Sequence, residues 1–221
     1  GDLILFQAKK FIELQQVNKN PVKSIGISVP GISNMKEGTV WAPNIPGWEA
    51  YPLKQEIEHI AGNMPILISG DRNCYIAGEH WKGNAKNCSN AIFIAVGTGI
   101  GAGIMTDGRI LNGANGIAGA IGWMALERPY KKTYDSSGCF ESMASGTGIV
   151  VQAKKMLENN PSYSGLLKAK PISEISTHDV FDAYSKKDEI AVEVFKNCIE
   201  MWGMATANLV SIFNAEKIIF G

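Results

Sequence analysis

The residues whose chemistry stands out most clearly are glycines and a threonine that directly follow an apolar run. Gly97, Thr98, Gly99 and Gly101 come after residues 91–96, whose composition is typical of a buried strand. Because glycine lacks a Cβ, backbone N–H groups at such positions can approach an anion closely, and the Thr98 hydroxyl adds a further donor. The spacing therefore predicts a turn that binds phosphate.

The glycine spacing departs from two familiar nucleotide-binding patterns. No G-x-x-x-x-G-K-[ST] string occurs in the chain, and Gly101 is followed by Gly103 and a second apolar segment rather than by a helix start. Asp107 and Gly108 then form a typical turn pair. These features favour a hairpin between two strands, and a hairpin that binds no ligand is the alternative interpretation.

Composition excludes several classes of function. The chain has 221 residues, with 21 basic and 21 acidic side chains and a formal net charge of zero. Without a basic cluster we expect no nucleic-acid binding through this portion, and the strand-sized apolar runs predict no membrane span. The cysteines at positions 74, 88, 139 and 198 form no C-x-x-C pair. They fit reduced thiols, so we expect a cytoplasmic protein.

Helical and strand-like segments alternate along the chain and would bring polar residues to strand ends. Helices are expected at residues 3–17, 52–61, 146–158, 177–184 and 188–213. Strands are expected at residues 23–29, 65–69, 91–96 and 217–221. Such alternation predicts an α/β protein in which helices pack on sheets. It places Gly70 and Asp71 directly after one strand.

Several separated strings together resemble the ROK family, named for repressors, open reading frames and kinases. The strings are residues 26–31 (GISVPG), 42–48 (APNIPGW), 70–73 (GDRN), 78–80 (GEH), 97–103 (GTGIGAG), 112–119 (NGANGIAG) and 207–209 (ANL). The resemblance implies an α/β actin-like ATPase fold, also described as ribonuclease-H-like, with two lobes around a cleft for sugar and nucleotide. We expect lobes at residues 1–86 and 87–221.

Both ends of the chain depart from the family pattern. The family's first phosphate motif, D-x-G-G-T, is absent, because residues 1–16 already resemble the helix that follows it. Residues 217–221 stop at the strand that ordinarily leads to a glycine pair and to helices on the adenosine side. We therefore expect an incomplete N-terminal lobe in a chain that belongs to a longer polypeptide.

The resemblance assigns roles to three further residues. Asp71 matches the family's catalytic base, and a carboxylate at a strand end can accept the proton of a sugar hydroxyl during phosphoryl transfer. Its alternative role is to cap the following helix. Asn44 and Glu141 match sugar contacts, although Asn44 could instead be a turn residue.

Departures from the family pattern concern the sugar and the metal. The family usually has Asn where this chain has Gly70, Glu where it has Ala120, and a sugar- and zinc-binding His where it has Trp123. Of the cysteines and the final glutamate in the family's zinc segment, C-x-C-G-x-x-G-C-x-E, only Cys139 and Glu141 remain, so we expect no zinc. Trp123 would then pack in the core or stack on a sugar face.

Two functions follow from the resemblance. The first is an ATP-dependent hexose kinase that uses ATP and Mg²⁺, with the segment 97–101 receiving the phosphate. The second is a non-catalytic, sugar-sensing repressor lobe. We expect a sugar substrate and a homodimer, and we leave the sugar open because three positions that normally select it have changed.

Overall fold

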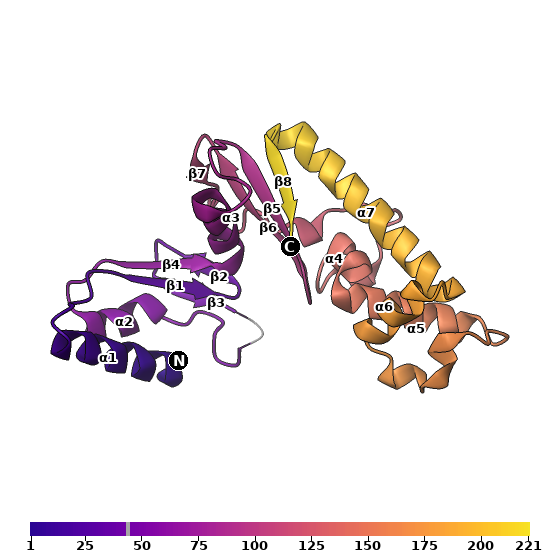
Figure 1. The fold of residues 1–221 in the computed structure, drawn as a ribbon, viewed down its shortest axis with the longest axis horizontal. Helices are drawn as coiled ribbons and strands as arrows, with labels where there is room; N and C mark the ends of the chain where they lie inside the picture. The colour runs from indigo at the N-terminus through magenta and orange to yellow at the C-terminus, as the bar shows by residue number, and fades with distance from the viewer. Residues whose placement is uncertain (43–44) are drawn as a thin grey trace.

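The computed structural model describes residues 1–42 and 45–221, which form two groups of elements joined by α3 (Figure 1). The first group contains α1 (Asp2–Val17), β1 (Ile25–Val29), β2 (Ile32–Asn34), β3 (Thr39–Trp41), α2 (Leu53–Ala61) and β4 (Ile66–Gly70). After α3 (Asp71–Lys82), the second contains β5 (Ala91–Val96), β6 (Ile100–Thr106), β7 (Arg109–Ile110), α4 (Cys139–Ala144), α5 (Gly146–Asn159), α6 (Thr177–Ser185), α7 (Glu189–Phe213) and β8 (Lys217–Phe220). Short 3-10 turns lie at Ile121–Trp123, Lys132–Tyr134, Leu166–Ala169 and Ile172–Glu174.

The first group is built on two parallel strands. β1 pairs with β4 in the register Ile25 to Ile66, and β2 and β3 form a separate antiparallel hairpin. The helices α1 and α2 contact each other and enclose a core that includes Ile12, Leu53 and Ile57. Burial of these side chains stabilises the layer.

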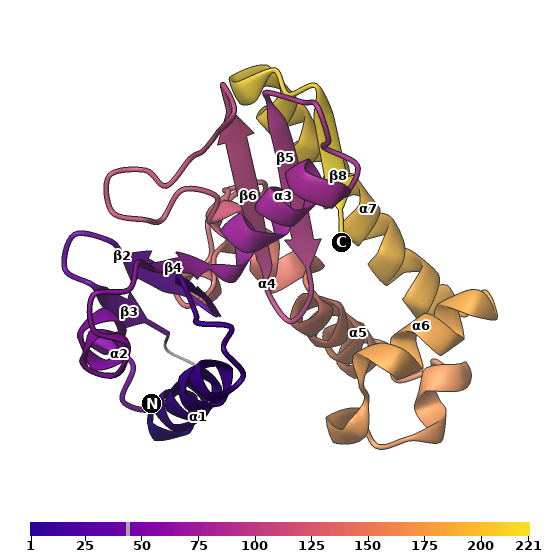
Figure 2. The same ribbon diagram turned by 60° about the vertical axis from the view of Figure 1, so that its left-hand side comes forward.

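The second group is built on a four-stranded sheet with helices on both faces. The strand order is β7-β6-β5-β8, with β5 antiparallel to β6 and parallel to β8. Ile94 and Ile104 belong to a core shared with α4–α7, whereas Met105 belongs to one shared with Ile76 of α3. Side chains alternate between the faces of a strand, so α3 and α7 cover opposite faces, as Figure 2 shows.

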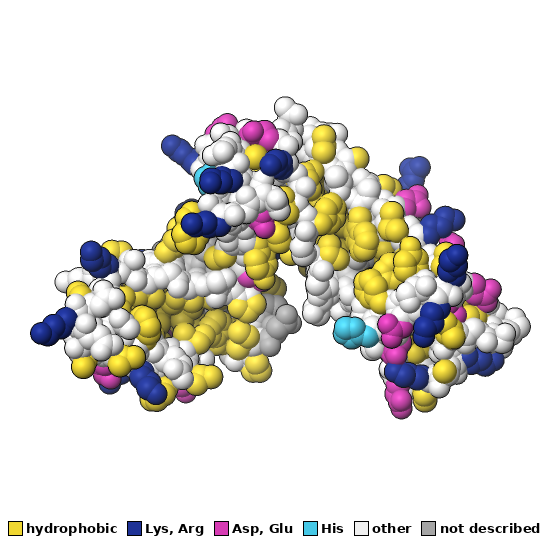
Figure 3. Space-filling view, viewed as in Figure 1, with side chains coloured by type: hydrophobic (Ala, Val, Ile, Leu, Met, Phe, Trp, Pro, Cys, Tyr) yellow, Lys and Arg dark blue, Asp and Glu magenta, His cyan; other side chains and the backbone are white. Residues whose placement is uncertain are grey.

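The helix α3 lies so close to β6 that only glycine fits between them. A Cβ on Gly103 would collide with the backbone carbonyl of Arg72 and would lie 2.8 Å from Cγ2 of Ile76. A Cβ on Gly101 would collide with the Arg72 side-chain stem. This contact fixes the start of α3 against the strand that leaves the glycine turn. Figure 3 shows the notch between the two groups.

Most of the expected elements are confirmed to within two residues at each end. The hairpin expected from the glycine spacing is also confirmed, because β5 and β6 pair around residues 97–99 and β6 pairs with β7 around Asp107 and Gly108. The helix after Asp71 was expected without bounds and is α3, whereas α4 and the hairpin of β2 and β3 were not anticipated. The lobe boundary after residue 86 stays a prediction. In the part of the chain that the structure describes, no helix is long and apolar enough to cross a bilayer.

The contact between α3 and β6 can be tested with a pair of glycine substitutions in strands. We predict that Gly103→Ala lowers the free energy of unfolding by about 1–3 kcal/mol, because the backbone carbonyl of Arg72 cannot move aside easily. Gly26→Ala in β1 is the control, since a Cβ there meets nothing within 4 Å, and it should change stability by no more than about 0.5–1 kcal/mol. Urea unfolding of both variants gives the comparison. Equal losses would contradict the packing role of Gly103.

Candidate functional site

The glycine turn between β5 and β6 is held from behind by the start of α5. Gly97 and Thr98 are exposed. The carbonyl of Gly97 accepts a hydrogen bond from the Gly146 amide at 2.8 Å, and the carbonyl of Thr98 accepts one from the Thr147 hydroxyl at 3.0 Å. The carbonyl groups of the turn are thus directed to α5, and Gly97 and Thr98 lie at the rim of a cavity.

The N-terminus of α5 borders the same cavity. Its N-cap is Ser145, which is buried and whose hydroxyl accepts a hydrogen bond from the Gly148 amide at 3.0 Å. The Thr177 hydroxyl donates to the Gly146 carbonyl at 3.0 Å and ties α6 to this helix start. A helix N-terminus favours negative charge because its first N–H groups lack partners within the helix. The amides of Thr98 in the turn and Thr147 at the helix start donate to no described residue, so each can offer one backbone donor to an anion.

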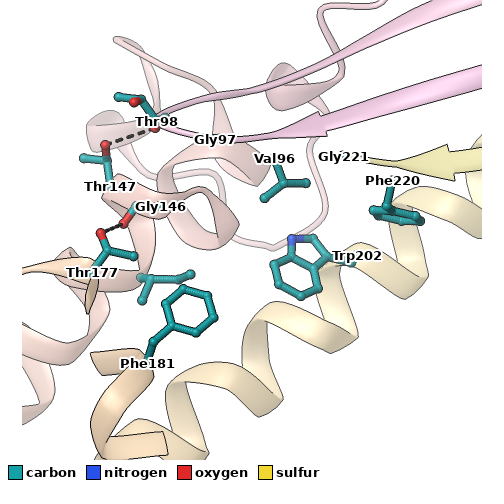
Figure 4. Close-up of a pocket in the computed structure, with 11 residues that line it drawn as sticks. Val96, Gly97, Thr98, Gly146, Thr147, Thr177, Phe181, Trp202, Phe220 and Gly221 are labelled. Atoms are coloured by element: carbon teal, nitrogen blue, oxygen red, sulfur yellow. Dashed lines mark hydrogen bonds between the residues drawn. The ribbon is translucent and has the colours of Figure 1, made fainter. Parts of the chain in front are cut away.

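The cavity beside the turn is lined largely by apolar and aromatic side chains (Figure 4). It has a volume of about 580 Å³ and lies between the turn, α5, α6, α7 and β8. Phe181, Trp202 and Phe220 contribute aromatic surfaces. The Trp202 indole donates to the Ala144 carbonyl at 3.1 Å, so its only polar group is satisfied and its ring orientation is fixed. Such a volume with a few polar groups at one end is typical of a small-ligand site.

Sequence reasoning missed the α5, α6 and α7 residues of this cavity. One signal was available, because the string Gly-Thr-Gly occurs twice, at residues 97–99 and again at residues 146–148. The structure brings the two strings into contact. No sequence pattern indicates that Phe181 and Trp202 line a cavity, since each occupies an ordinary apolar position of an amphipathic helix.

Asp71 is the first residue of α3 and is half-buried. Its Oδ1 accepts a hydrogen bond from the amide of Arg72 at 2.8 Å, and the N-cap position belongs to Gly70, which has no side chain to make a capping bond. The capping alternative is therefore not realised in the usual form, although a carboxylate in the first turn still stabilises the helix. In a second hydrogen bond, the side-chain Nδ2 of Asn73 donates to Oδ1 of Asn112 at 2.9 Å. This bond ties the start of α3 to the segment after β7.

Glu141 lies in the first turn of α4 and touches the glycine turn directly. Its Oε2 accepts a hydrogen bond from the backbone amide of Ile100 at 2.7 Å. A Cβ on Gly99 would lie 2.6 Å from this oxygen, so the carboxylate lies against the turn where a side chain would otherwise stand. The structure thus brings Glu141 to the turn and, through the contact of Arg72 with Gly101, brings the helix of Asp71 to the same strand.

The other assigned residues have mixed outcomes. Asn44 lies outside the described residues, and its role as a sugar contact stays a prediction. Gly101 is a buried residue of β6, and the absence of a side chain there makes room for Arg72. The structure therefore gives Gly101 a packing role. Its assignment to the cofactor also stays a prediction. Thr98 and Gly99 lie on the turn, where expected.

Ala120 and Trp123 lie beside an apolar hollow of about 550 Å³, and Asp71 and Glu141 are not among its lining residues. Trp123 is 53% exposed there, next to Ile212 of α7. The structure therefore gives Trp123 a half-exposed position against apolar neighbours, which is neither full burial in the core nor a place beside the base.

The segment that carries zinc in the family is held here by a side-chain cluster. Tyr134 is buried, and its hydroxyl donates to the Glu127 carboxylate, which also pairs with Lys131 at 2.7 Å. Hydrogen bonds from Lys131 and Tyr134 lower the pKa of Glu127 below its usual value. Cys139 is buried nearby, and the described residues hold no group of three or more potential metal ligands. This donor set does not fit a tetrahedral zinc ion.

Comparisons of sequence agree with these features. A sequence profile of the ROK family matches residues 3–221. A glucokinase from Halalkalibacterium halodurans is 34% identical over 207 residues, which are 92% of this chain and 62% of that protein. A xylose repressor from Caldicellulosiruptor bescii is 31% identical over 202 residues, which are 90% of this chain and 50% of that protein. The chain belongs to the ROK family and spans about half to two thirds of these relatives.

Solved structures of a kinase and of a transcriptional regulator share the fold. A ROK family glucokinase from Streptomyces griseus, crystallised with glucose and AMPPNP, is 29% identical with a TM-score of 0.74, over 92% of this chain and 66% of that one. A ROK family transcriptional regulator, a homologue of the E. coli MLC protein, is 28% identical with a TM-score of 0.82, over 100% of this chain and 55% of that one. The expected actin-like ATPase fold of mixed α and β structure is confirmed.

The cluster around Glu127 gives a prediction about metal. We predict that the protein contains no stoichiometric zinc and that a chelator leaves its melting temperature unchanged, because hydrogen bonds hold the segment instead. Tyr134→Phe should lower the free energy of unfolding by about 1–2 kcal/mol, since it removes a bond to a charged acceptor. Tyr75→Phe, whose hydroxyl bonds to no described residue, is the control. One equivalent of zinc in metal analysis, or equal effects of the two substitutions, would contradict this account.

Proposed function

We propose that the protein carrying this chain is an ATP-dependent sugar kinase that transfers the terminal phosphoryl group of ATP to a sugar hydroxyl. One observation carries the proposal: Asp71 begins a helix that packs on β6, the strand that leaves the glycine turn. A base and a phosphate site must lie close together for phosphoryl transfer. The kinase relatives support the same interpretation.

The cavity beside the turn fits a nucleotide. In the proposal, the turn at Gly97 and Thr98 and the N-terminus of α5 receive the phosphates, because the amides of Thr98 and Thr147 donate to no described residue. The aromatic surfaces of Phe181 and Trp202 fit the flat, weakly polar base of ATP. Mg²⁺ bound to the phosphates would offset the negative charge that increases during transfer.

The sugar would lie between Asp71 and Glu141. Asp71 accepts the proton of the attacking hydroxyl, which raises the nucleophilicity of the oxygen. Asn44 and Glu141 hold other hydroxyl groups through amide and carboxylate hydrogen bonds. In this proposal residues 1–86 and 87–221 form the two lobes, and the protein is a homodimer.

A sugar-sensing repressor is the second candidate. Gly70, Ala120 and Trp123 stand where kinases of the family carry polar sugar contacts, and repressors are among the relatives. Loss of such contacts would be compatible with a protein that only senses a sugar. The kinase is favoured because Asp71 and the turn are both retained and a ligand-sized cavity adjoins the turn.

The role of Asp71 gives the test of the proposal. We predict that Asp71→Asn in the full-length protein abolishes phosphoryl transfer, because an amide cannot accept the proton, while sugar affinity stays within about tenfold. ADP release and calorimetric sugar binding measure the two effects. Asp107→Asn, in the exposed turn between β6 and β7, is the control and should keep full activity. Normal turnover of Asp71→Asn would exclude Asp71 as the base.

A further inference from the structure

Glu141 links the glycine turn to the start of α5, the two segments that border the proposed nucleotide cavity. Its side chain accepts the Ile100 amide of the glycine turn, as described above. Its backbone carbonyl accepts the amide of Ser145, the N-cap of α5, at 3.2 Å. A displacement of Glu141 would therefore move the turn, the helix start, or both.

The carboxylate occupies a slot that glycines leave open. Besides its contact with Gly99, it lies where a Cβ on Gly122 would be 3.0 Å from Oε2 and 2.9 Å from the Glu141 Cβ. A side chain at either glycine would displace the carboxylate from Ile100. The close fit fixes Oε2, whereas no described residue donates a hydrogen bond to Oε1. The carboxylate therefore has one oxygen engaged by the turn and one available to a further donor.

We propose that Glu141 is a positioning residue that couples the sugar site to the nucleotide site, an inference that rests on the proposed kinase function. A sugar hydroxyl that donates to Oε1 immobilises the carboxylate and so holds Ile100 and the turn in the arrangement seen here. The turn then binds nucleotide phosphates with a smaller loss of conformational freedom. Coupling of this kind is reciprocal, so the nucleotide raises the affinity for sugar by the same factor.

Calorimetry on the full-length protein tests this coupling, with AMPPNP and D-glucose as probes. We expect glucose to raise the affinity of the wild-type protein for AMPPNP at least about fivefold, the lower end of typical coupling between sites. Glu141→Ala should reduce this enhancement to less than twofold and should weaken AMPPNP binding in the absence of glucose. Glu141→Gln keeps an acceptor oxygen for Ile100 and should restore AMPPNP affinity without glucose to within about threefold.

Glu127→Ala is the matched control. Glu127 and Glu141 both line a wide groove along α4 and α5, but Glu127 does not contact the turn. It should lower the melting temperature and leave the enhancement by glucose intact. Wild-type coupling in Glu141→Ala, or equal loss of coupling in Glu127→Ala, would overturn the role of Glu141. Binding of both probes to wild type without mutual enhancement would do the same, whereas failure of wild type to bind AMPPNP at all would instead contradict the proposed kinase.

Discussion

The site depends on three glycines that leave alternate positions at the start of β6 without side chains. Gly99, Gly101 and Gly103 are spaced by two residues at the start of β6, and each missing side chain makes room for a different neighbour. Glu141 lies against the first, the stem of Arg72 against the second, and the backbone of α3 against the third. The helix of the proposed base can pack on β6, and the carboxylate of α4 can reach the turn, because these positions carry no side chains.

The glycine run thus has two roles in one continuous string. The part before β6 is a turn in which the Thr98 amide donates to no described residue, whereas the part within β6 is a packing surface. A spacing of two residues is the spacing of one face of a strand, so Gly101 and Gly103 could have been assigned to packing from the sequence alone. The structure gives Gly101 a packing role, and its assignment to the cofactor stays a prediction.

Much of the fold could be predicted because the spacing of apolar residues in many segments indicates a helix or a strand directly. The long amphipathic helix α7 and the apolar strand β5 are examples. The helix α3 was expected after Asp71 but its extent was not predicted, because it is largely polar, contains Gly78 and buries fully only Ile76. Its stability comes from packing on β6, which no local pattern reveals. Likewise α4 is a six-residue helix whose first turn is fixed by contacts from elsewhere in the chain.

The candidate site was predicted in part for a similar reason. Asp71 and the turn belong to short continuous strings, and the family resemblance could identify them. The aromatic lining of the cavity comes from α6, α7 and β8, which follow one another in the sequence but lie far along the chain from the glycine turn and meet it only in the folded protein. The bond between Glu141 and Ile100 spans 41 residues and was equally hidden.

The most direct test of the kinase is a search for its product. The full-length protein, incubated with ATP, Mg²⁺ and each member of a panel of hexoses and N-acetylhexosamines, should convert at least one sugar to its phosphate ester with one ADP formed for each. Mass spectrometry of the sugar and a coupled assay for ADP measure both products. Clear binding of a sugar with no phosphate ester from any member of the panel would contradict the kinase and favour the sugar-sensing repressor.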